Sequence, residues 1–437
     1  MTEVNLVNNL WILICGLLVF SMTISVGFLE IGELGEKYAK SLLQKLLITG
    51  SALFFMGFLG FNIAFAPTIS GIIGNPTYGD GIFLGGFSST AIGLQSGVWW
   101  SMDTPYFSTG LTTSAYFLFE ASFAAVSLAL VGVVVLRKVK LEAFLAYSVA
   151  FFIVIWSLPA AWIWNPTGWL YLLGVRDFAG GLVVHGAAGA AGLAIVYRIW
   201  REEKKKGLKE SAVVVPNVNP GWTSLAILLL WLGWFGFNPG SVLALNSSAM
   251  TVVLTTFLAA AASLLSTAFF RYTVTKKNLD LLYADNGILI GLIVITPLAG
   301  FVSPASAVVL GIIAGPLFLA GERWLSRYKW FSDPIGLFSG HMLGGLFGLM
   351  MIAFFTQNAF AVASGNDTLP SGLFFGGGLV AFHQLALEAF ATVVVMAAVF
   401  AMSYVTLEVI ARAMHGITTN YEKEGLMPTV ESSLNRL

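Results

Sequence analysis

The chain has 437 residues with 22 basic and 22 acidic side chains, so its formal net charge is zero. Hydrophobic residues make up 57 % of the sequence and charged residues only 10 %, whereas a soluble domain carries about a quarter charged residues. This composition excludes a soluble enzyme or a disordered scaffold, and the lack of a basic stripe argues against a nucleic-acid partner. The sequence therefore predicts an integral membrane protein whose surroundings are a lipid bilayer.

Eleven segments are long and apolar enough to be helices that cross a bilayer, which takes about 20 apolar residues. No basic residue precedes the first segment, so it is interpreted as a retained helix rather than a signal peptide. The sequence predicts an all-α membrane domain over residues 1–411 and a cytoplasmic tail over 412–437. The predicted spans cover 7–32, 42–66, 113–136, 141–164, 178–200, 222–238, 249–273, 284–301, 304–325, 334–356 and 374–411.

Lysine and arginine residues gather on one side of these spans. Of the 22 basic residues, 21 follow an odd-numbered span, and only Arg176 lies on the other side. Basic residues are enriched in cytoplasmic loops, so the pattern predicts an external N-terminus and a cytoplasmic C-terminus. We expect a multi-pass protein of the plasma membrane.

Two segments share the pattern Asp-x2-Gly-x4-His-x3-Gly. The first runs from Asp177 to Gly189 at the start of span 5, and the second from Asp333 to Gly345 at the start of span 10. Because five spans separate them, the two copies enter the membrane from opposite sides. This arrangement is typical of an inverted repeat, which places a pathway at the repeat interface. The predicted fold is a 5+5 inverted repeat followed by one final helix.

Each aspartate is expected to cap a helix, and the histidine eight residues later lies about 12 Å further along the axis. His185 and His341 are therefore expected near the middle of the bilayer, where an ionisable side chain normally faces a cavity or pathway. A single such histidine is explained by packing, but two at equivalent positions favour a pore. Neutral imidazole donates through one nitrogen and accepts through the other, so two rings in contact are suited to relay a proton. The spans contain neither a nucleophile–base pair nor a metal-ligand cluster, so no enzyme, metal or cofactor is predicted.

These motifs resemble the Amt/Mep/Rh family of ammonium transporters, and its Amt branch in particular. The likeness extends from the first span to about residue 426. It implies an eleven-helix protomer, a homotrimer with one pore per subunit, ammonium or ammonia as the substrate, and regulation by a PII-type signalling protein at the cytoplasmic face. The motifs that carry the resemblance are residues 177–185, 233–241 and 333–341, with support from 119–124 and 296–300.

The resemblance implies an outer recruitment site above a gate. Phe123 and Phe237 would form the gate as stacked phenyl rings. Trp164 and Ser241 would join Phe123 in the recruitment site. Aromatic faces attract a cation there through their ring quadrupoles, and Ser241 would accept a hydrogen bond from it.

The resemblance also implies that Asp177 supports this vestibule without binding substrate, and that His185 and His341 are the twin histidines of the pore. Phenyl and imidazole rings replace the hydration shell of K+ or Na+ poorly. Ammonium differs from these ions because it can give up a proton and cross as neutral NH3. The chemistry of the residues thus agrees with the implied substrate.

Some positions depart from the family pattern. Glu120 stands three residues before the gate phenylalanine, where the family commonly has glutamine. A carboxylate in mid-membrane is expensive unless it is protonated or paired, which leaves a neutral structural acid and a proton or cation role as alternatives. The loop at 32–40 and the tail at 422–427 also differ from the family motifs.

The leading interpretation is an ammonium transporter that recruits NH4+ outside, deprotonates it and conducts NH3, with the proton relayed by the two histidines. An alternative is a sensor that binds ammonium and signals through its C-terminal tail or a partner. A second alternative is a channel that passes NH3 or CO2 without net charge.

Overall fold

A computed structural model describes residues 3–35, 38–78, 110–136, 138–206, 219–278, 280–328, 333 and 335–419. The tail motif at 422–427 lies outside these residues. The described part of the chain is a helical bundle with one two-stranded antiparallel ribbon, β1 (Thr68–Ile69) and β2 (Ile73–Gly74).

Eleven helical segments of the described residues are long and apolar enough to cross a membrane, which confirms the predicted count. Six are single helices: α1 (Glu3–Leu34), α5 (Thr113–Val135), α10 (Pro220–Gly240), α11 (Ser247–Thr275), α13 (Pro304–Leu325) and α16 (Gly378–Ala413). The eighth span joins α12 (Leu281–Ile295) to a 3-10 turn at Thr296–Leu298.

The other four spans each contain a π-helical turn. The second runs from α2 (Tyr38–Phe55) through Met56–Gly60 to α3 (Phe61–Phe65), and the fourth from α6 (Leu141–Ala150) through Phe151–Ile155 to α7 (Ser157–Ile163). The fifth and tenth begin with the π turn: Gly181–Gly186 leads into α9 (Ala187–Lys205), and Leu337–Met342 leads into α14 (Leu343–Phe355). The remaining helices α8 (Trp169–Leu173) and α15 (Asn358–Ala363) are too short to cross a bilayer.

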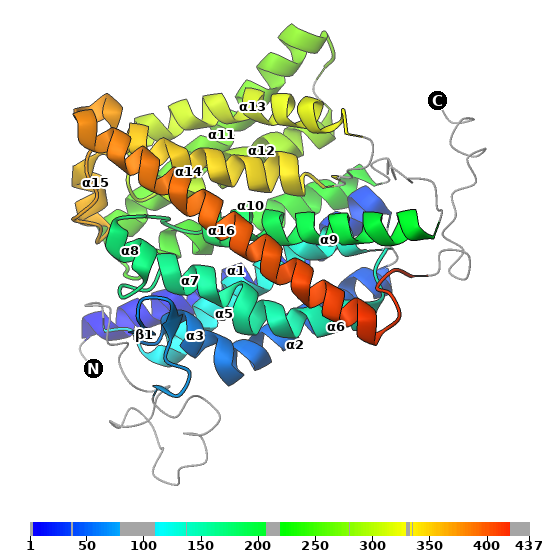
Figure 1. Ribbon diagram of the computed structural model, residues 1–437. Helices are drawn as coiled ribbons and strands as arrows, with labels where there is room; N and C mark the ends of the chain where they lie inside the picture. Colours follow the sequence, from blue (N-terminus) through cyan, green and yellow to red (C-terminus); the bar gives the residue numbers. More distant parts are fainter. Residues whose placement is uncertain are drawn as a thin grey trace.

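The spans differ in how much protein surrounds them. In α5, 94 % of the most apolar window is buried, compared with 22 % in α16. Helix α5 therefore belongs to the centre of the bundle, whereas α16 lies diagonally across its surface (Figure 1). Helix α1 begins at one end of the bundle and α16 ends at the opposite end (Figure 1), as an odd number of spans requires.

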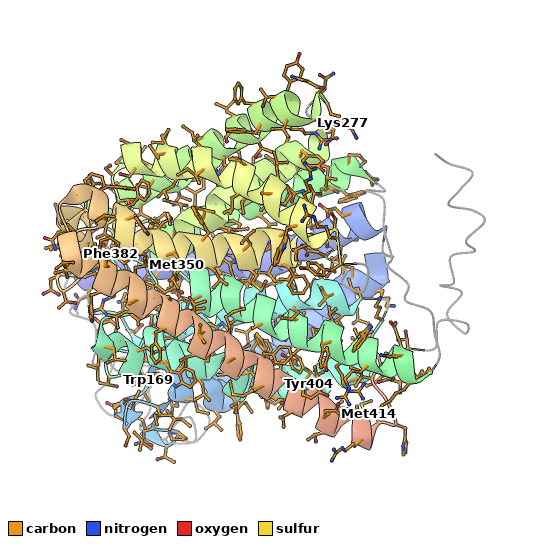
Figure 2. The ribbon with its side chains drawn as sticks, turned by 45° about the horizontal axis from the view of Figure 1, so that its top comes forward. Trp169, Lys277, Met350, Phe382, Tyr404 and Met414 are labelled. Atoms are coloured by element: carbon orange, nitrogen blue, oxygen red, sulfur yellow. The ribbon has the colours of Figure 1, made fainter. Side chains whose placement is uncertain are left out.

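The two ends of the bundle carry different residues. Figure 2 shows Lys277 and Met414 at one end, and Trp169 and Phe382 at the other. Lys277 follows α11, the seventh span, so a loop from the basic side lies at the same end as the close of the final helix. This agrees with the sidedness that the loop charges predict.

Lys45, counted in that prediction at the start of the second span, is a buried residue of α2. It forms an ion pair with Glu30 of α1. Ser41 donates to the same carboxylate at 2.6 Å, and Lys45 donates to Gln44 Oε1 at 2.7 Å. A buried charge is tolerated only when it is paired and hydrogen-bonded, so Lys45 joins two helices rather than marking a membrane surface.

Candidate functional site

The fifth span begins with a capped and tightly turned segment. Asp177 Oδ1 accepts hydrogen bonds from the N–H groups of Gly180 and Gly181 at 3.0 and 2.7 Å. Its Oδ2 accepts from Leu182 and Val183 at 2.8 and 2.9 Å. Burial raises the pKa of Asp177, and the four N–H donors oppose this by stabilising its charged form. One carboxylate thus satisfies the four N–H groups that a helix start leaves without a partner.

The tenth span begins in the same way. Asp333 accepts from the N–H groups of Phe338 and Ser339 at 3.0 and 2.8 Å, and from the Ser339 hydroxyl at 2.7 Å. Gly336 and its counterpart Gly180 both have a left-handed backbone, with φ of 69° and 111°, a conformation that costs glycine nothing. Each glycine is followed by a π-helical turn that ends just beyond the histidine. The sequence repeat is therefore also a repeat of local structure.

The fifth and tenth spans cross in opposite directions, and glycines line the contact between them. A Cβ atom at Gly345 would overlap the carbonyl oxygen of Gly181 and come within 2.9 Å of the His185 Cβ. At the other end of the crossing, a Cβ at Gly189 would come within 2.6 Å of the Met342 side chain. The start of each segment thus packs against the continuation of the other, as expected for an inverted repeat.

This crossing brings the two histidines together. The Nδ1 atoms of His185 and His341 are 3.2 Å apart, and the ring centroids are 5.1 Å apart. Both side chains are buried. Two nitrogens at this distance hold one hydrogen between them, so one ring donates while the other accepts.

Gly340 precedes His341 and is buried. A Cβ atom added to Gly340 would meet no atom within 4 Å outside its own stretch of helix. The packing at this position therefore leaves room for a methyl group.

A column of aromatic rings continues from the first histidine. His185 stacks on Phe237 with centroids 6.0 Å apart and an angle of 15° between the planes. Phe237 contacts Phe123 at 4.2 Å, and Phe123 contacts Trp164 edge-on at 5.9 Å. Phe123 and Phe237 are each only 1 % exposed. The two phenyl rings therefore separate His185 from Trp164.

Trp164 and Ser241 lie at the more exposed end of this column, where both are half-buried. Trp164 Nε1 donates to the Asp177 carbonyl at 2.7 Å, which ties the indole to the capped segment. The Ser241 hydroxyl donates to the Phe237 carbonyl at 2.9 Å. Its oxygen lone pairs remain directed away from that bond and are available to accept one.

The structure adds a residue that the sequence analysis did not single out. Trp234 lies 6.1 Å from His185, nearly parallel to it, and 5.5 Å from Phe237. Its Nε1 donates to the Thr296 hydroxyl at 3.1 Å, which fixes the indole plane. Trp234 and Thr296 fall inside motifs quoted above, at 233–241 and 296–300. This placement is the sequence feature that could have pointed to them.

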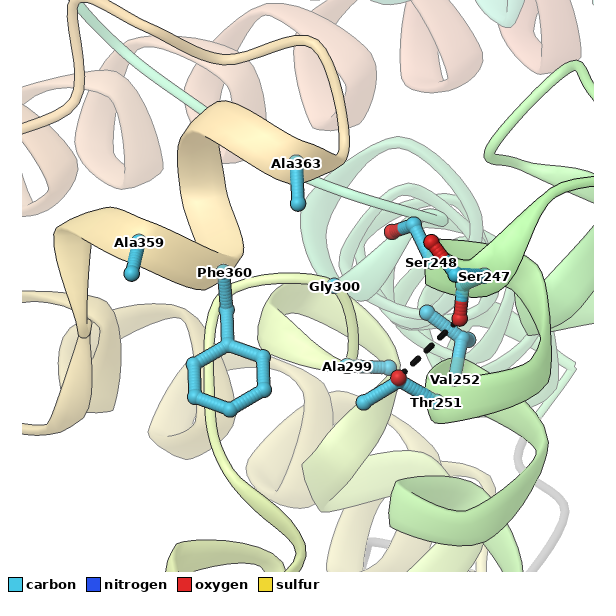
Figure 3. Close-up of a pocket in the computed structure, with 9 residues that line it drawn as sticks. All are labelled: Ser247, Ser248, Thr251, Val252, Ala299, Gly300, Ala359, Phe360 and Ala363. Carbon is cyan, nitrogen blue, oxygen red and sulfur yellow. Dashed lines mark hydrogen bonds between the residues drawn. The ribbon is translucent and has the colours of Figure 1, made fainter.

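A separate pocket of about 170 Å³ opens on the surface between the start of α11, the turn at 299–300 and α15 (Figure 3). Within it, Thr251 donates to the Ser247 carbonyl at 3.1 Å. None of the ring column lines this pocket, and no group of three metal-ligating side chains occurs among the residues that the structure describes. The lining residues are Ser247, Ser248, Thr251, Val252, Ala299, Gly300, Ala359, Phe360 and Ala363.

The bundle defines a multi-pass membrane protein, and comparisons with known proteins identify its class as a transporter. Residues 10–429 match the Ammonium Transporter Family, and the chain belongs to this family. The ammonium transporter of Bacillus subtilis is 30 % identical over 405 residues, which cover 92 % of each chain. A putative ammonium transporter of Synechocystis sp. is 33 % identical over 365 residues, or 80 % of this chain and 76 % of that protein.

Solved structures share the fold. A sensor Amt protein superposes with a TM-score of 0.80 at 24 % identity and covers 98 % of both chains. Saccharomyces cerevisiae Mep2 superposes with a TM-score of 0.77 at 25 % identity, over 94 % of this chain and 86 % of that one. Membership of this family supports ammonium transport rather than enzymatic catalysis, with ammonium or ammonia as the substrate.

Proposed function

We propose that the chain recruits NH4+ at the outer aromatic end of the ring column and conducts NH3 past the phenyl pair. The proton follows through the histidine pair. The observation that carries this proposal is the continuous column from Trp164 through Phe123 and Phe237 to His185, which ends on the 3.2 Å contact with His341.

Each part of the column suits one step. The face of Trp164 attracts a cation, and the Ser241 oxygen accepts one of its N–H bonds. The buried phenyl rings offer nothing to replace an ion's hydration shell, so a charged species is held back while NH3 passes. The histidines, which share one hydrogen bond, take up and hand on the proton that ammonium releases.

We place the protein in the plasma membrane as a homotrimer, with the N-terminus outside and residues 412–437 as a cytoplasmic tail. The end that carries Lys277 and Met414 would then face the cytoplasm (Figure 2). A PII-type partner would dock at this same end. Helices α1 and α10 offer an apolar face for contact between subunits, because both turn exposed leucines outward along the bundle.

One contact favours the sensor as a second candidate. The segment after α16 returns to the bundle, where Glu202 of α9 accepts hydrogen bonds from the N–H groups of Ile417 and Thr418 at 3.0 and 3.2 Å. Helix α9 continues directly from the π-helical turn that carries His185. A change at the histidine pair therefore has a short route to the C-terminal segment.

The test is the current from purified protein in liposomes on a solid-supported membrane after an ammonium jump. We expect a transient current with ammonium, none with a matched K+ jump, and its loss in His185→Ala. No current despite saturable uptake of NH3 would favour the electroneutral channel. Binding of ammonium with neither current nor uptake would favour the sensor.

A further inference from the structure

Helix α5 carries a buried acid that the proposed pathway does not use. Glu120 is 5 % exposed and lies within the most enclosed span of the bundle. The Tyr116 side chain, one turn earlier on the same helix, is hydrogen-bonded to it. Its Oε2 is buried and has no hydrogen-bond partner among the residues that the structure describes.

The other two glutamates buried deep in the spans have stronger partners. Glu30 is paired with Lys45. Glu388 of α16 accepts from the backbone N–H of Arg176 at 3.0 Å and from the Gln384 amide at 2.7 Å. One oxygen of Glu388 also lacks a partner among the described residues, but its other oxygen accepts these two bonds. Within the same residues, Glu120 has only the tyrosine hydroxyl as a partner. A buried carboxyl group with so few partners in a membrane interior is costly, so packing does not explain this site.

The position of Glu120 indicates what is missing. It precedes Phe123 by three residues, and side chains three apart lie on one helix face. Helix α5 starts at the end of the bundle where Trp164 and Asp177 lie, so Glu120 stands about one turn outside the phenyl pair. Glu120 and Phe123 therefore share one face of α5, with Glu120 about one turn nearer the outer end.

We propose that Glu120 is an ammonium-binding residue of this chain, with Oε2 accepting an N–H bond from NH4+ immediately outside the phenyl pair. This rests on the proposed recruitment site and deepens it. The aromatic faces attract a cation of any kind, whereas a fixed oxygen acceptor binds more tightly to a cation that has N–H donors. A charge-assisted hydrogen bond is about twice as strong as a neutral one, so the glutamate strengthens binding beyond what the rings and Ser241 provide.

The test compares Glu120→Gln with Glu388→Gln by the ammonium dependence of the transient current. Both changes replace a carboxyl group by an amide of nearly the same shape, and in both residues Oε2 is buried without a partner among the described residues. We expect Glu120→Gln to raise the half-saturating ammonium concentration about tenfold, because it loses a charge-assisted bond. The maximal current should stay largely unchanged. Glu388→Gln keeps an acceptor for the Arg176 N–H and should leave the half-saturating concentration unchanged.

A second measurement does not depend on transport. A ligand that binds only the folded protein raises its melting temperature. Ammonium chloride should therefore stabilise the wild type more than potassium chloride at equal ionic strength. Glu120→Gln should lose most of this difference, and Glu120→Asp, which keeps the charge, should retain more of it.

The outcomes separate the two proposals. If the half-saturating concentration and the ammonium-specific stabilisation of Glu120→Gln both equal those of the wild type, Glu120 does not bind ammonium. If the wild type gives no current but Glu120→Gln loses the stabilisation, the binding role stands and the transport proposal fails.

Discussion

At the scale of single residues, the protein handles buried acids in three ways. Asp177 is surrounded by backbone N–H donors, Glu30 is paired with Lys45, and one oxygen of Glu120 has no hydrogen-bond partner within the described part of the chain. The first two arrangements are structural: Asp177 caps the start of a helical span, and the Glu30–Lys45 pair joins two helices. The third stands next to the gate, where we assign it to substrate.

Asp177→Asn tests the scaffold role. The amide nitrogen of asparagine is a donor, so it cannot accept from the backbone N–H groups that now bond to one carboxylate oxygen of Asp177. The hydrogen bonds to that oxygen are therefore lost. We expect a loss of roughly 2 kcal/mol in stability, seen as a lower melting temperature, together with a reduced ammonium current. Asp280→Asn is the matched control, because this residue is 55 % exposed and asparagine caps a helix equally well. Equal melting temperatures for the two variants would contradict the prediction.

At the scale of elements, the pore depends on how closely the fifth and tenth spans approach each other. Gly181 and Gly345 allow backbone contact at the crossing, which leaves room for His185 and His341 to meet side by side. Small residues serve this purpose in membrane helices generally, because they let the backbones come close. The histidine contact therefore depends on these glycines as much as on the histidines themselves.

Gly345→Ala is expected to open this contact between the two spans. The added methyl group would overlap the Gly181 carbonyl oxygen and crowd His185, and such overpacking costs about 1–3 kcal/mol. Gly340→Ala, in the same segment, should leave the melting temperature unchanged because its Cβ meets open space. Thermal unfolding of both variants in detergent gives the comparison. A drop for Gly340→Ala alone would show that the crossing is looser than described.

At the scale of the whole molecule, distant parts of the chain are tied together. Glu202 of α9 receives the segment after α16, and Lys140 donates to the carbonyl groups of Met414 and Gly416 at 3.2 and 2.9 Å. The start of the fourth span and the fifth span are thus linked to the segment that follows the eleventh. The ring column itself lies within one chain, so each subunit of an oligomer would hold a complete pathway.

The exposed leucines of α1 recur at positions 6, 10, 13 and 17, and those of α10 at 225, 228 and 232. Heptad-like spacing of this kind forms one continuous apolar face, which the homotrimer proposed above would use for contact with another copy of the chain. Native mass spectrometry of the protein released from detergent should give the mass of three chains. A monomer as the main species under these conditions would reject the trimer.

The sequence by itself determined the number of spans, the repeat and the family. These follow from local properties, because span length is counted residue by residue and the spacing of Asp, Gly and His is visible in one short segment. The loop charges likewise predicted which ends of the spans lie together, although Lys45, counted at the start of the second span, is a buried partner of Glu30.

Only the tertiary structure decided which side chains meet. His185 and His341 are 156 residues apart in the chain, and nothing in their spacing gives the 3.2 Å contact. Lys45 could not be placed without Glu30 of the neighbouring helix, nor Trp234 without the plane of His185. The role proposed for Glu120 likewise depends on the absence of a partner. The physical reason is that a buried polar group is stabilised by whichever partner the packed helices bring to it, and that partner comes from a distant part of the sequence.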